Sequence, residues 1–253
     1  MRIGIAGING RMGRLLVEEV VRGGAELIGG VDKSGAAEGS IRLFPDMSAL
    51  AQDCDLVIEF THASAVQPHA AALVKAGVGW VLGTSGLSAV DEAAVRDAAS
   101  RIPVVYAANF SPGVALVLDA AERLAAALPA EEYDAEIVEM HHRQKVDAPS
   151  GTAIALGRAV AAGRGVDLAN VAERGRNGHT GARAPGAIGF AALRGGQIVG
   201  EHTLIFAGRS EHIELTHRAF DRRAFAGGAV RAALWLHGKP PGLYGMRDVL
   251  GLA

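Results

Sequence analysis

Short apolar runs alternate with segments of helical spacing over the first hundred residues. Residues 2–6 form a brief apolar run, and Met12, Leu16 and Val20 then fall on related turns of a helix. Strands that alternate with helices are typical of βαβ units around a parallel sheet. The pattern predicts strands at 2–6, 25–31, 56–60, 78–82 and 104–107, and helices at 12–22, 65–76 and 91–101.

The pattern changes near residues 111–113, and from residue 187 three strands follow one another without helices between them. Runs at 187–193, 198–206 and 211–216 are separated only by short turns, which favours a mixed or antiparallel sheet. The other elements predicted are a strand at 133–140, helices at 114–128, 152–162 and 224–236, and an irregular tail at 240–244. We therefore expect an α/β fold, with a Rossmann-type domain joined to an α+β domain that has a mixed sheet.

Glycines with nucleotide-binding spacing lie between the first predicted strand and the first predicted helix. Gly7 permits a tight turn, Gly10 lets backbone N–H groups approach a pyrophosphate, and Gly13 allows close packing of helix on sheet. Asn9 stands where the strict motif has glycine, and asparagine tolerates a left-handed backbone better than most residues. Because the chain holds 34 glycines, a plain surface turn is the alternative. The flanking strand and helix favour a dinucleotide site.

An acidic residue, Asp32, follows the second predicted strand, where a carboxylate can accept hydrogen bonds from an adenosine ribose. Lys33 comes next and could pair with a 2′-phosphate, so we expect the protein to use both NADH and NADPH. The loops 83–86 and 108–111 follow the fourth and fifth strands, where open α/β sheets bind ligands. Ordinary loop chemistry would also explain these two loops.

Composition narrows the class of protein. Hydrophobic residues make up 49% of the 253 residues and charged residues 21%, which argues against disorder. The net charge of −2 argues against a nucleic-acid partner and against a polybasic membrane anchor. The longest uncharged stretch, 102–118, contains Asn109 and Pro112 and is not typical of a membrane span. The single cysteine, Cys54, fits a reducing compartment, so a soluble cytoplasmic protein is expected.

The most informative stretch is 139–153, where two imidazoles, a guanidinium and an ammonium lie close together in sequence. His141 and His142 can donate protons near neutral pH. Lys145 can pair with a carboxylate or donate a proton. Neighbours in a strand face opposite sides, so the two histidines share one site only if the strand ends or bends there.

A helix start follows these cations. Ser150 is the predicted N-cap, with Gly151 and Thr152 in the first turn, and their N–H and hydroxyl groups suit a carboxylate. A zinc site lacks further ligands of the expected spacing, and a serine nucleophile lacks the usual glycine-flanked elbow. A solvated basic strand end is the remaining alternative.

The whole chain resembles the 4-hydroxy-tetrahydrodipicolinate reductase (dihydrodipicolinate reductase) family. The stretch 139–153 carries the strongest likeness, and the glycine-rich turn 7–13 and the loop 108–111 agree with it. Further matching motifs, in order along the chain, are 188–190, 194–196, 198–202, 225–229 and 241–244. The likeness runs from end to end.

This resemblance implies reduction of 4-hydroxy-tetrahydrodipicolinate to tetrahydrodipicolinate by NADH or NADPH, with loss of water, in the diaminopimelate route to lysine. It implies a dinucleotide-binding domain of residues 1–110 with 222–253. Residues 111–221 would form a second domain that binds the small dicarboxylate and builds a homotetramer. Two domains around one reaction make closure on substrate a natural expectation.

Roles for single residues follow from the same resemblance. His141 matches the family's proton donor and Lys145 its partner acid, with no metal ligand implied. The residues matched to substrate carboxylate binding are His142, Ser150, Gly151 and Thr152. Together with the nucleotide motif and the loops described above, the residues expected to bind the cofactor are Gly7, Ile8, Asn9, Gly10, Arg11, Met12, Asp32, Lys33, Phe60, Gly83, Thr84, Ser85, Ala107, Ala108, Asn109 and Phe110.

Three positions depart from the family pattern, and two other functions stay open. Glu59 and Ser85 replace an aspartate and a threonine and keep the chemical type, whereas Pro112 replaces an apolar residue and could alter the hinge between domains. One alternative is a dehydrogenase of another small carboxylate such as aspartate. The other is a nucleotide-sensing binding protein without chemistry, which retention of His141 and Lys145 argues against.

Overall fold

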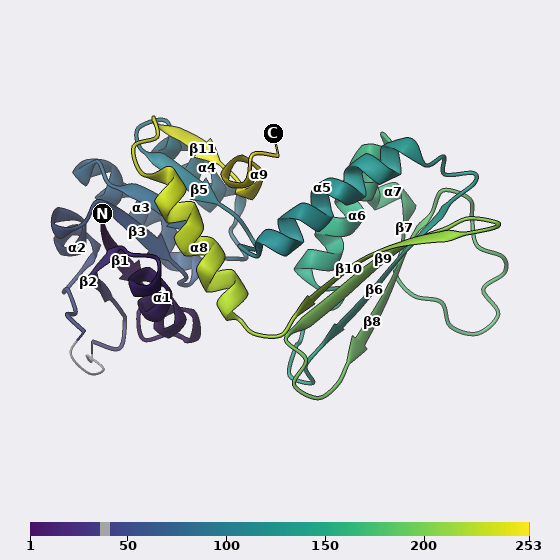
Figure 1. Cartoon of the computed structure of the whole chain (residues 1–253), viewed down its shortest axis with the longest axis horizontal. Helices are drawn as coiled ribbons and strands as arrows, with labels where there is room; N and C mark the ends of the chain where they lie inside the picture. The colour runs from purple at the N-terminus through teal and green to yellow at the C-terminus, as the bar shows by residue number, and fades with distance from the viewer. Residues whose placement is uncertain (36–40, 253) are drawn as a thin grey trace. The chain divides into compact units, whose positions relative to one another are not determined.

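The strands of the N-terminal half pair as a six-stranded parallel sheet in the order β11-β5-β4-β3-β1-β2 (Figure 1). The computed structural model describes residues 1–35 and 41–252. It divides into two compact units, Met1–Pro112 with Arg222–Ala253, and Gly113–Asp221. The Rossmann-type parallel sheet expected from the sequence is confirmed.

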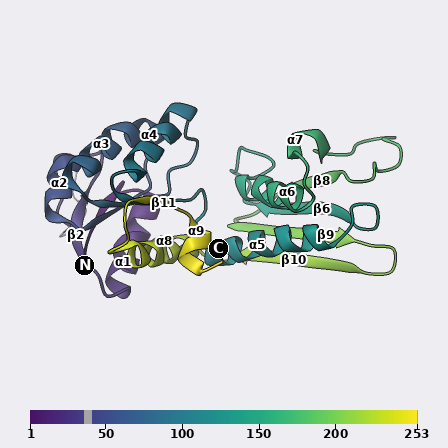
Figure 2. The same ribbon diagram turned by 90° about the horizontal axis from the view of Figure 1, so that it is seen from above.

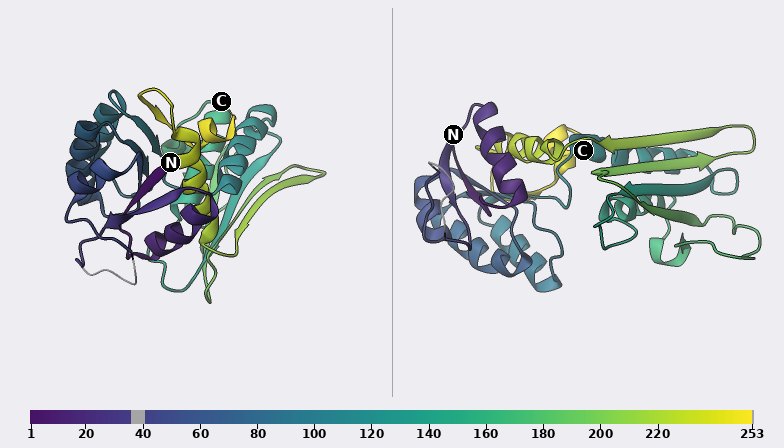
Figure 3. Two further views of the ribbon diagram at one scale, coloured as in Figure 1. Left: turned by 60° about the vertical axis from the view of Figure 1, so that its left-hand side comes forward. Right: turned by 90° about the horizontal axis from the view of Figure 1, so that it is seen from below.

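Helices cover both faces of this sheet, and for that reason its central strands are continuously apolar. Figures 2 and 3 show α1 and α8 side by side on one face, with α2, α3 and α4 on the other. The strands are β1 (Arg2–Ala6), β2 (Glu26–Val31), β3 (Leu56–Glu59), β4 (Gly79–Leu82), β5 (Pro103–Tyr106) and β11 (Gly242–Tyr244). The helices are α1 (Arg11–Arg22), α2 (Met47–Asp53), η1 (Ala63–Ala65), α3 (Val66–Ala76), α4 (Ala89–Ala99), α8 (Arg223–Leu236) and α9 (Met246–Leu250).

Of the short elements in the first unit that the sequence did not predict, which also include η1 and α9, two are informative. The tail 240–244 is not irregular throughout, because Gly242–Tyr244 forms β11 and pairs with β5, placing Leu243 opposite Val104. The helix α2 was not expected, although the Asp46 side chain caps it by accepting from the Ala49 N–H at 2.9 Å. Both elements are too short to show a period in the sequence.

The second unit contains a five-stranded sheet in the order β10-β9-β6-β8-β7. Pairings of β6 with β8 and β8 with β7 are parallel, whereas β9 runs antiparallel to both β6 and β10, so the expected mixed sheet is confirmed. Its strands are β6 (Asp134–His141), β7 (Ala172–Glu173), β8 (Ile188–Arg194), β9 (Gly200–Ala207) and β10 (His212–Ala219). Its helices are α5 (Pro112–Ala127), α6 (Gly151–Gly163) and α7 (Leu168–Val171).

The core of the second unit lies between its helices and one face of its sheet. Ala121 of α5, Leu156 of α6 and Phe206 of β9 are all buried there. Buried and half-buried residues alternate strictly along β6. Because side chains of a strand alternate between faces, Glu139 and His141 point to the same side as the core residue Ile137. Among the described helices of the chain, none is both long and apolar enough to cross a membrane.

Candidate active site

The turn after β1 has a backbone that only glycine suits at two positions. Gly7 has φ of +79°, and a Cβ added there would lie 2.7 Å from the carbonyl oxygen of Phe60. A Cβ on Gly13 would lie 2.2 Å from the carbonyl oxygen of Gly7. The turn is tied to β2, since the Gly7 N–H donates to the Val31 carbonyl at 2.9 Å. The predicted tight turn and close helix packing are therefore confirmed.

The N-terminus of α1 is open to an anion. Its N-cap is Gly10, which has no side chain to cap the first turn, so N–H groups there can meet phosphate oxygens. Among the other predicted residues of this turn, Ile8 is buried, Met12 is half-buried and Arg11 is exposed. The residues present thus fit a dinucleotide.

Asp32 follows β2 and orders the loop around it. One carboxylate oxygen accepts from the Asn9 N–H at 3.2 Å and the other from the Ser34 N–H at 2.9 Å. Burial would raise the pKa of Asp32, but these hydrogen bonds and the charge of Lys33 hold it below the ordinary value. An ionised carboxylate with lone pairs to spare can accept ribose hydroxyls. The side-chain amide of Asn9, which stands where the strict motif has glycine, donates to the Ser34 hydroxyl at 2.9 Å. Asn9 therefore links the glycine turn to the loop after β2.

Loops at the carboxyl ends of β3, β4 and β5 come together beside the glycine turn. A Cβ on Gly83 would lie 2.3 Å from the Phe60 ring, which packs edge-on against Phe110 with centroids 5.7 Å apart. The Thr84 hydroxyl accepts from the Thr61 N–H at 3.2 Å. These contacts unite Phe60, Gly83, Thr84 and Phe110. The other residues predicted for this edge are the exposed Lys33, Ser85 and Ala108 and the half-buried Ala107 and Asn109.

Glu59 supports the same edge from inside the core. Its carboxylate is fully buried and accepts from Trp80 Nε1 at 3.0 Å. His69 Nδ1 lies 2.8 Å from the other oxygen. The glutamate that replaces the family's usual aspartate is thus a hydrogen-bonded core residue.

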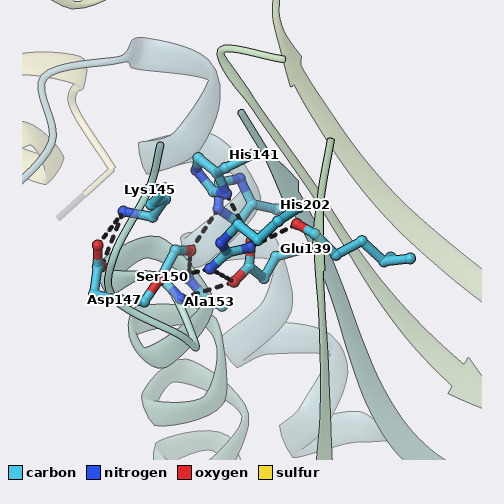
Figure 4. Close-up of polar contacts among 9 residues, drawn as sticks. Glu139, His141, Lys145, Asp147, Ser150, Ala153 and His202 are labelled. Atoms are coloured by element: carbon cyan, nitrogen blue, oxygen red, sulfur yellow. Dashed lines mark hydrogen bonds and ion pairs between the residues drawn. The ribbon is translucent and has the colours of Figure 1, made fainter. Parts of the chain in front are cut away.

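The chemistry-bearing residues of the second unit gather around a buried carboxylate, Glu139 (Figure 4). One of its oxygens lies 2.6 Å from His141 Nδ1, and the other accepts from the Ser150 N–H at 3.1 Å. Arg194 completes the set with a bidentate contact, in which its two terminal guanidinium nitrogens each donate to one carboxylate oxygen at 2.8 Å. All four acceptor positions of the carboxylate are therefore used.

The charge state of this cluster follows from its contacts. Burial would raise the pKa of Glu139, but hydrogen bonds from Arg194, His141 and the Ser150 backbone hold it below the ordinary value. Burial lowers the pKa of His141, Glu139 opposes the change, and Lys145 and Arg194 add to it. Because the carboxylate is ionised, His141 Nδ1 must carry a proton and donate it. Among the described residues, the hydrogen bond of His141 is made through Nδ1, and Nε2 makes none.

A second imidazole, His202, lies against His141 with ring centroids 5.0 Å apart. Its Nε2 is 2.9 Å from the Ser150 hydroxyl. Burial, and secondarily the charge of His141, lower the pKa of His202 to about 4. His202 is consequently neutral at neutral pH.

The loop after β6 carries Lys145. Its ammonium is bound to the carboxylate of Asp147 at 2.8 and 2.9 Å, and Figure 4 shows it turned toward Asp147 rather than into the Glu139 cluster.

β6 ends at His141, so the two adjacent histidines are not forced to opposite faces. The His142 N–H donates to the Ile198 carbonyl at 2.8 Å, and its Nδ1 is buried without a partner among the described residues.

The start of α6 agrees with the prediction from sequence. Ser150 is the N-cap, and its hydroxyl accepts from the Ala153 N–H at 3.2 Å. That hydroxyl is buried and already engaged. The exposed Gly151 and half-buried Thr152 are the residues of this helix start that a carboxylate can reach.

Sequence reasoning missed three members of the cluster, namely Glu139, Arg194 and His202. Glu139 could have been found, because it lies near the end of the predicted strand 133–140, two residues before His141, and would share its face if the strand continued by one residue. Arg194 and His202 lie in motifs that carried the family resemblance. Their contacts depend on how β8 and β9 pair with β6, which a single sequence does not give.

The nucleotide-binding sheet of the first unit and the ionisable cluster of the second define an NAD(P)-dependent oxidoreductase. Residues 1–110 match the family model described as "Dihydrodipicolinate reductase, N-terminus", and residues 113–250 match "Dihydrodipicolinate reductase, C-terminus". The chain therefore belongs to the dihydrodipicolinate reductase family.

Similar proteins agree over the full length. The 4-hydroxy-tetrahydrodipicolinate reductase of Granulibacter bethesdensis is 66% identical over 255 residues, which cover 100% of this chain and 97% of the relative. The enzyme of the same name from Gluconacetobacter diazotrophicus is 65% identical over 252 residues, with 100% and 98% covered. A solved dipicolinate-bound dihydrodipicolinate reductase from Paenisporosarcina sp. TG-14 has a TM-score of 0.80 at 26% identity and covers 98% of both chains.

Proposed function

We infer that this protein reduces 4-hydroxy-tetrahydrodipicolinate to tetrahydrodipicolinate, with loss of water, in the diaminopimelate route to lysine. The observation that carries the inference is the family match over both units, with relatives of that name at up to 66% identity. The hydrogen-bonded cluster of Glu139, His141 and Arg194 supplies the proton chemistry that such a reduction needs.

NADH or NADPH would be held by the glycine turn, the open start of α1 and Asp32, with Phe60 and Phe110 at the other loops. When bound, it supplies the hydride. The protein has to place the substrate and deliver a proton, which are the tasks of the second unit.

Substrate carboxylates would bind at the start of α6 and at the neighbouring cations. Gly151 and Thr152 offer N–H groups at the positive end of the helix dipole. The unpartnered Nδ1 of His142 and the ammonium of Lys145 add donors beside them. Lys145 must leave Asp147 to take this part.

His141 is the proposed proton donor. Its Nδ1 is held by Glu139, so the proton leaves from Nε2 of the imidazolium to the conjugated imine system of the substrate. Lys145, which lies close enough to influence the pKa of His141, assists. A positioned acid of this kind contributes about 10²- to 10⁴-fold in rate.

We also propose a cytoplasmic homotetramer built through the second sheet. All helices described in that unit contribute their buried residues to the core on one face. The strand pairing places Val138, Met140, Ala191 and Leu193 on the opposite face, and Leu193 is 45% exposed. An apolar strip of this kind on an exposed sheet face is typical of subunit contacts. Light scattering coupled to gel filtration gives the mass of the assembly.

The function is tested by following absorbance at 340 nm while the preceding synthase makes the substrate from pyruvate and aspartate semialdehyde. Synthase-dependent oxidation of NADH or NADPH is the expected result. Oxidation of NADH or NADPH that does not depend on the synthase would indicate a dehydrogenase of another small carboxylate. No oxidation by folded protein that still binds nucleotide would indicate a sensing protein.

A further inference from the structure

Glu139 contacts two parts of the proposed substrate site directly and is linked to a third part through Arg194. It binds His141 through Nδ1, and it binds the first residue before α6 through the Ser150 N–H. Its partner Arg194 also donates to the carbonyl oxygen of Asp147 at 2.6 Å. Arg194 thereby attaches the loop that carries Lys145.

A carboxylate in this position is costly unless it is paired. Glu139 is only 1% exposed, whereas Arg194 is 21% exposed and reaches the surface. Buried ion pairs contribute little net stability compared with apolar side chains of the same volume. Packing therefore does not account for this carboxylate, but its hydrogen bonds to His141 and to the start of α6 do, together with its contact to Arg194, which holds the loop.

We propose that Glu139 is a positioning residue, which together with Arg194 fixes His141, the start of α6 and the Lys145 loop in the arrangement that the reduction requires. The proposal rests on the proposed function, because it assigns His141 as the proton donor. The Nδ1–H of His141 keeps its proton and its hydrogen bond to Glu139 throughout the reaction. Nε2 alone therefore exchanges a proton with the substrate.

The groups that face His141 come from four elements. Glu139 lies on the same strand, Lys145 on the following loop, Arg194 at the end of β8 and His202 on β9. Of these, Glu139 alone favours the charged imidazolium, since the lysine and arginine are cations and His202 is neutral. Removal of the carboxylate must therefore make the imidazolium harder to form.

The test variant is Glu139→Gln, which keeps the shape and removes the charge. Glu136 provides the matched control: it lies on the same strand, faces away from His141 and pairs with Arg176 and Arg183. We expect Glu139→Gln to lower kcat about 10- to 100-fold, the usual effect of losing an orienting partner. The fall of kcat with rising pH should begin at lower pH than in the wild type. Glu136→Gln should leave both quantities unchanged.

Two further variants, Glu139→Asp and Arg194→Lys, distinguish a positioning role of Glu139 from an effect on folding. Glu139→Asp keeps the charge and should restore the wild-type pH profile in part. Arg194→Lys keeps a cation but loses the two-pronged contact and the hold on the loop, so we expect a raised KM with little change of the pH profile. If Glu139→Gln does not fold, this KM increase in Arg194→Lys decides the question, and an unchanged KM would overturn the proposal.

A readout without substrate distinguishes failure of the inference from failure of the proposed function. Imidazole ¹⁵N shifts, with His141 identified among the nine histidines by its absence in His141→Gln, should show a proton on Nδ1 in the wild type and its loss in Glu139→Gln. That result supports the positioning role even if the wild type does not reduce the proposed substrate. The same tautomer and pH profile in wild type and Glu139→Gln, or an equal loss of activity in Glu136→Gln, would falsify it.

Discussion

We expect His202 to make a large contribution to how the stability of the second unit depends on pH. Its imidazole is 4% exposed, and burial lowers its pKa from 6.5 to about 4. The folded protein therefore binds this proton less readily than the unfolded chain. Stability from this group is complete above the unfolded pKa near 6.5 and is lost as the pH falls toward 4.

The magnitude follows from the difference of about 2.5 between the His202 pKa of 6.5 in the unfolded chain and the pKa of about 4 in the folded protein. At 1.36 kcal/mol for each unit, the full effect is about 3 kcal/mol. Between pH 7.5 and pH 5, the unfolded chain becomes protonated while the folded imidazole mostly does not. His202 should therefore cost the folded state about 2 kcal/mol over this interval.

Urea unfolding at the two pH values measures this cost. Circular dichroism is the suitable signal, because Trp80 and Trp235 both lie in the first unit and tryptophan fluorescence does not report directly on the second. The comparison variant is His202→Gln, whose amide can still bond the Ser150 hydroxyl but does not titrate. His212→Gln is the control, since that side chain is 63% exposed and meets water in both states.

We expect the wild type and His212→Gln to lose about 2 kcal/mol more than His202→Gln when the pH is lowered from 7.5 to 5. The difference between variants removes the contributions of all groups that they share. An equal loss in His202→Gln and wild type would mean that His202 is already solvated in the folded protein, and the reasoning from burial would be refuted.

Further predictions concern the reaction. His141→Gln should lower kcat by about 10²- to 10⁴-fold with KM little changed, and a fall under threefold in steady-state assays would remove His141 from the mechanism. Lys145→Ala should raise KM and lower kcat, so unaltered values of both would contradict its role. Asp147→Asn releases the Lys145 ammonium and should lower the substrate KM by up to about fivefold, the equivalent of a surface ion pair, whereas a raised KM would count against this competition. The kcat/KM ratio for NADH and NADPH should stay within a thousandfold either way, and a larger ratio would contradict use of both.

The first unit could be predicted from sequence to the extent that its elements are long or continuously apolar. β1, β3 and β4 are buried on both faces, so their runs are uninterrupted and easily recognised. β11 has only three residues and is a strand because β5 offers it an unpaired edge. Such an element is defined by its neighbour, and the residues of the tail carry no pattern of their own.

The same distinction applies to the site. The cap at Ser150 depends on the next three residues, so local sequence was enough to predict it. Glu139 and His141 are linked by the period of one strand. Arg194 and His202 meet Glu139 across 55 and 63 residues, through the pairing of His141 with Arg194 and of Glu139 with His202 in the sheet. That register depends on the packing of the whole unit and was beyond the sequence pattern.

The two buried imidazoles of the cluster lie close to the same carboxylate and yet suit different tasks. Two positive charges with ring centroids 5.0 Å apart would repel each other, so at most one ring is charged near neutral pH. Glu139 accepts a hydrogen bond from His141, whereas His202 faces the hydroxyl of Ser150. The carboxylate thus selects which ring can hold the proton. In active sites, neighbouring groups take acid and supporting roles when their environments separate their pKa values. This asymmetry is a physical reason, independent of family resemblance, to place the donated proton on His141.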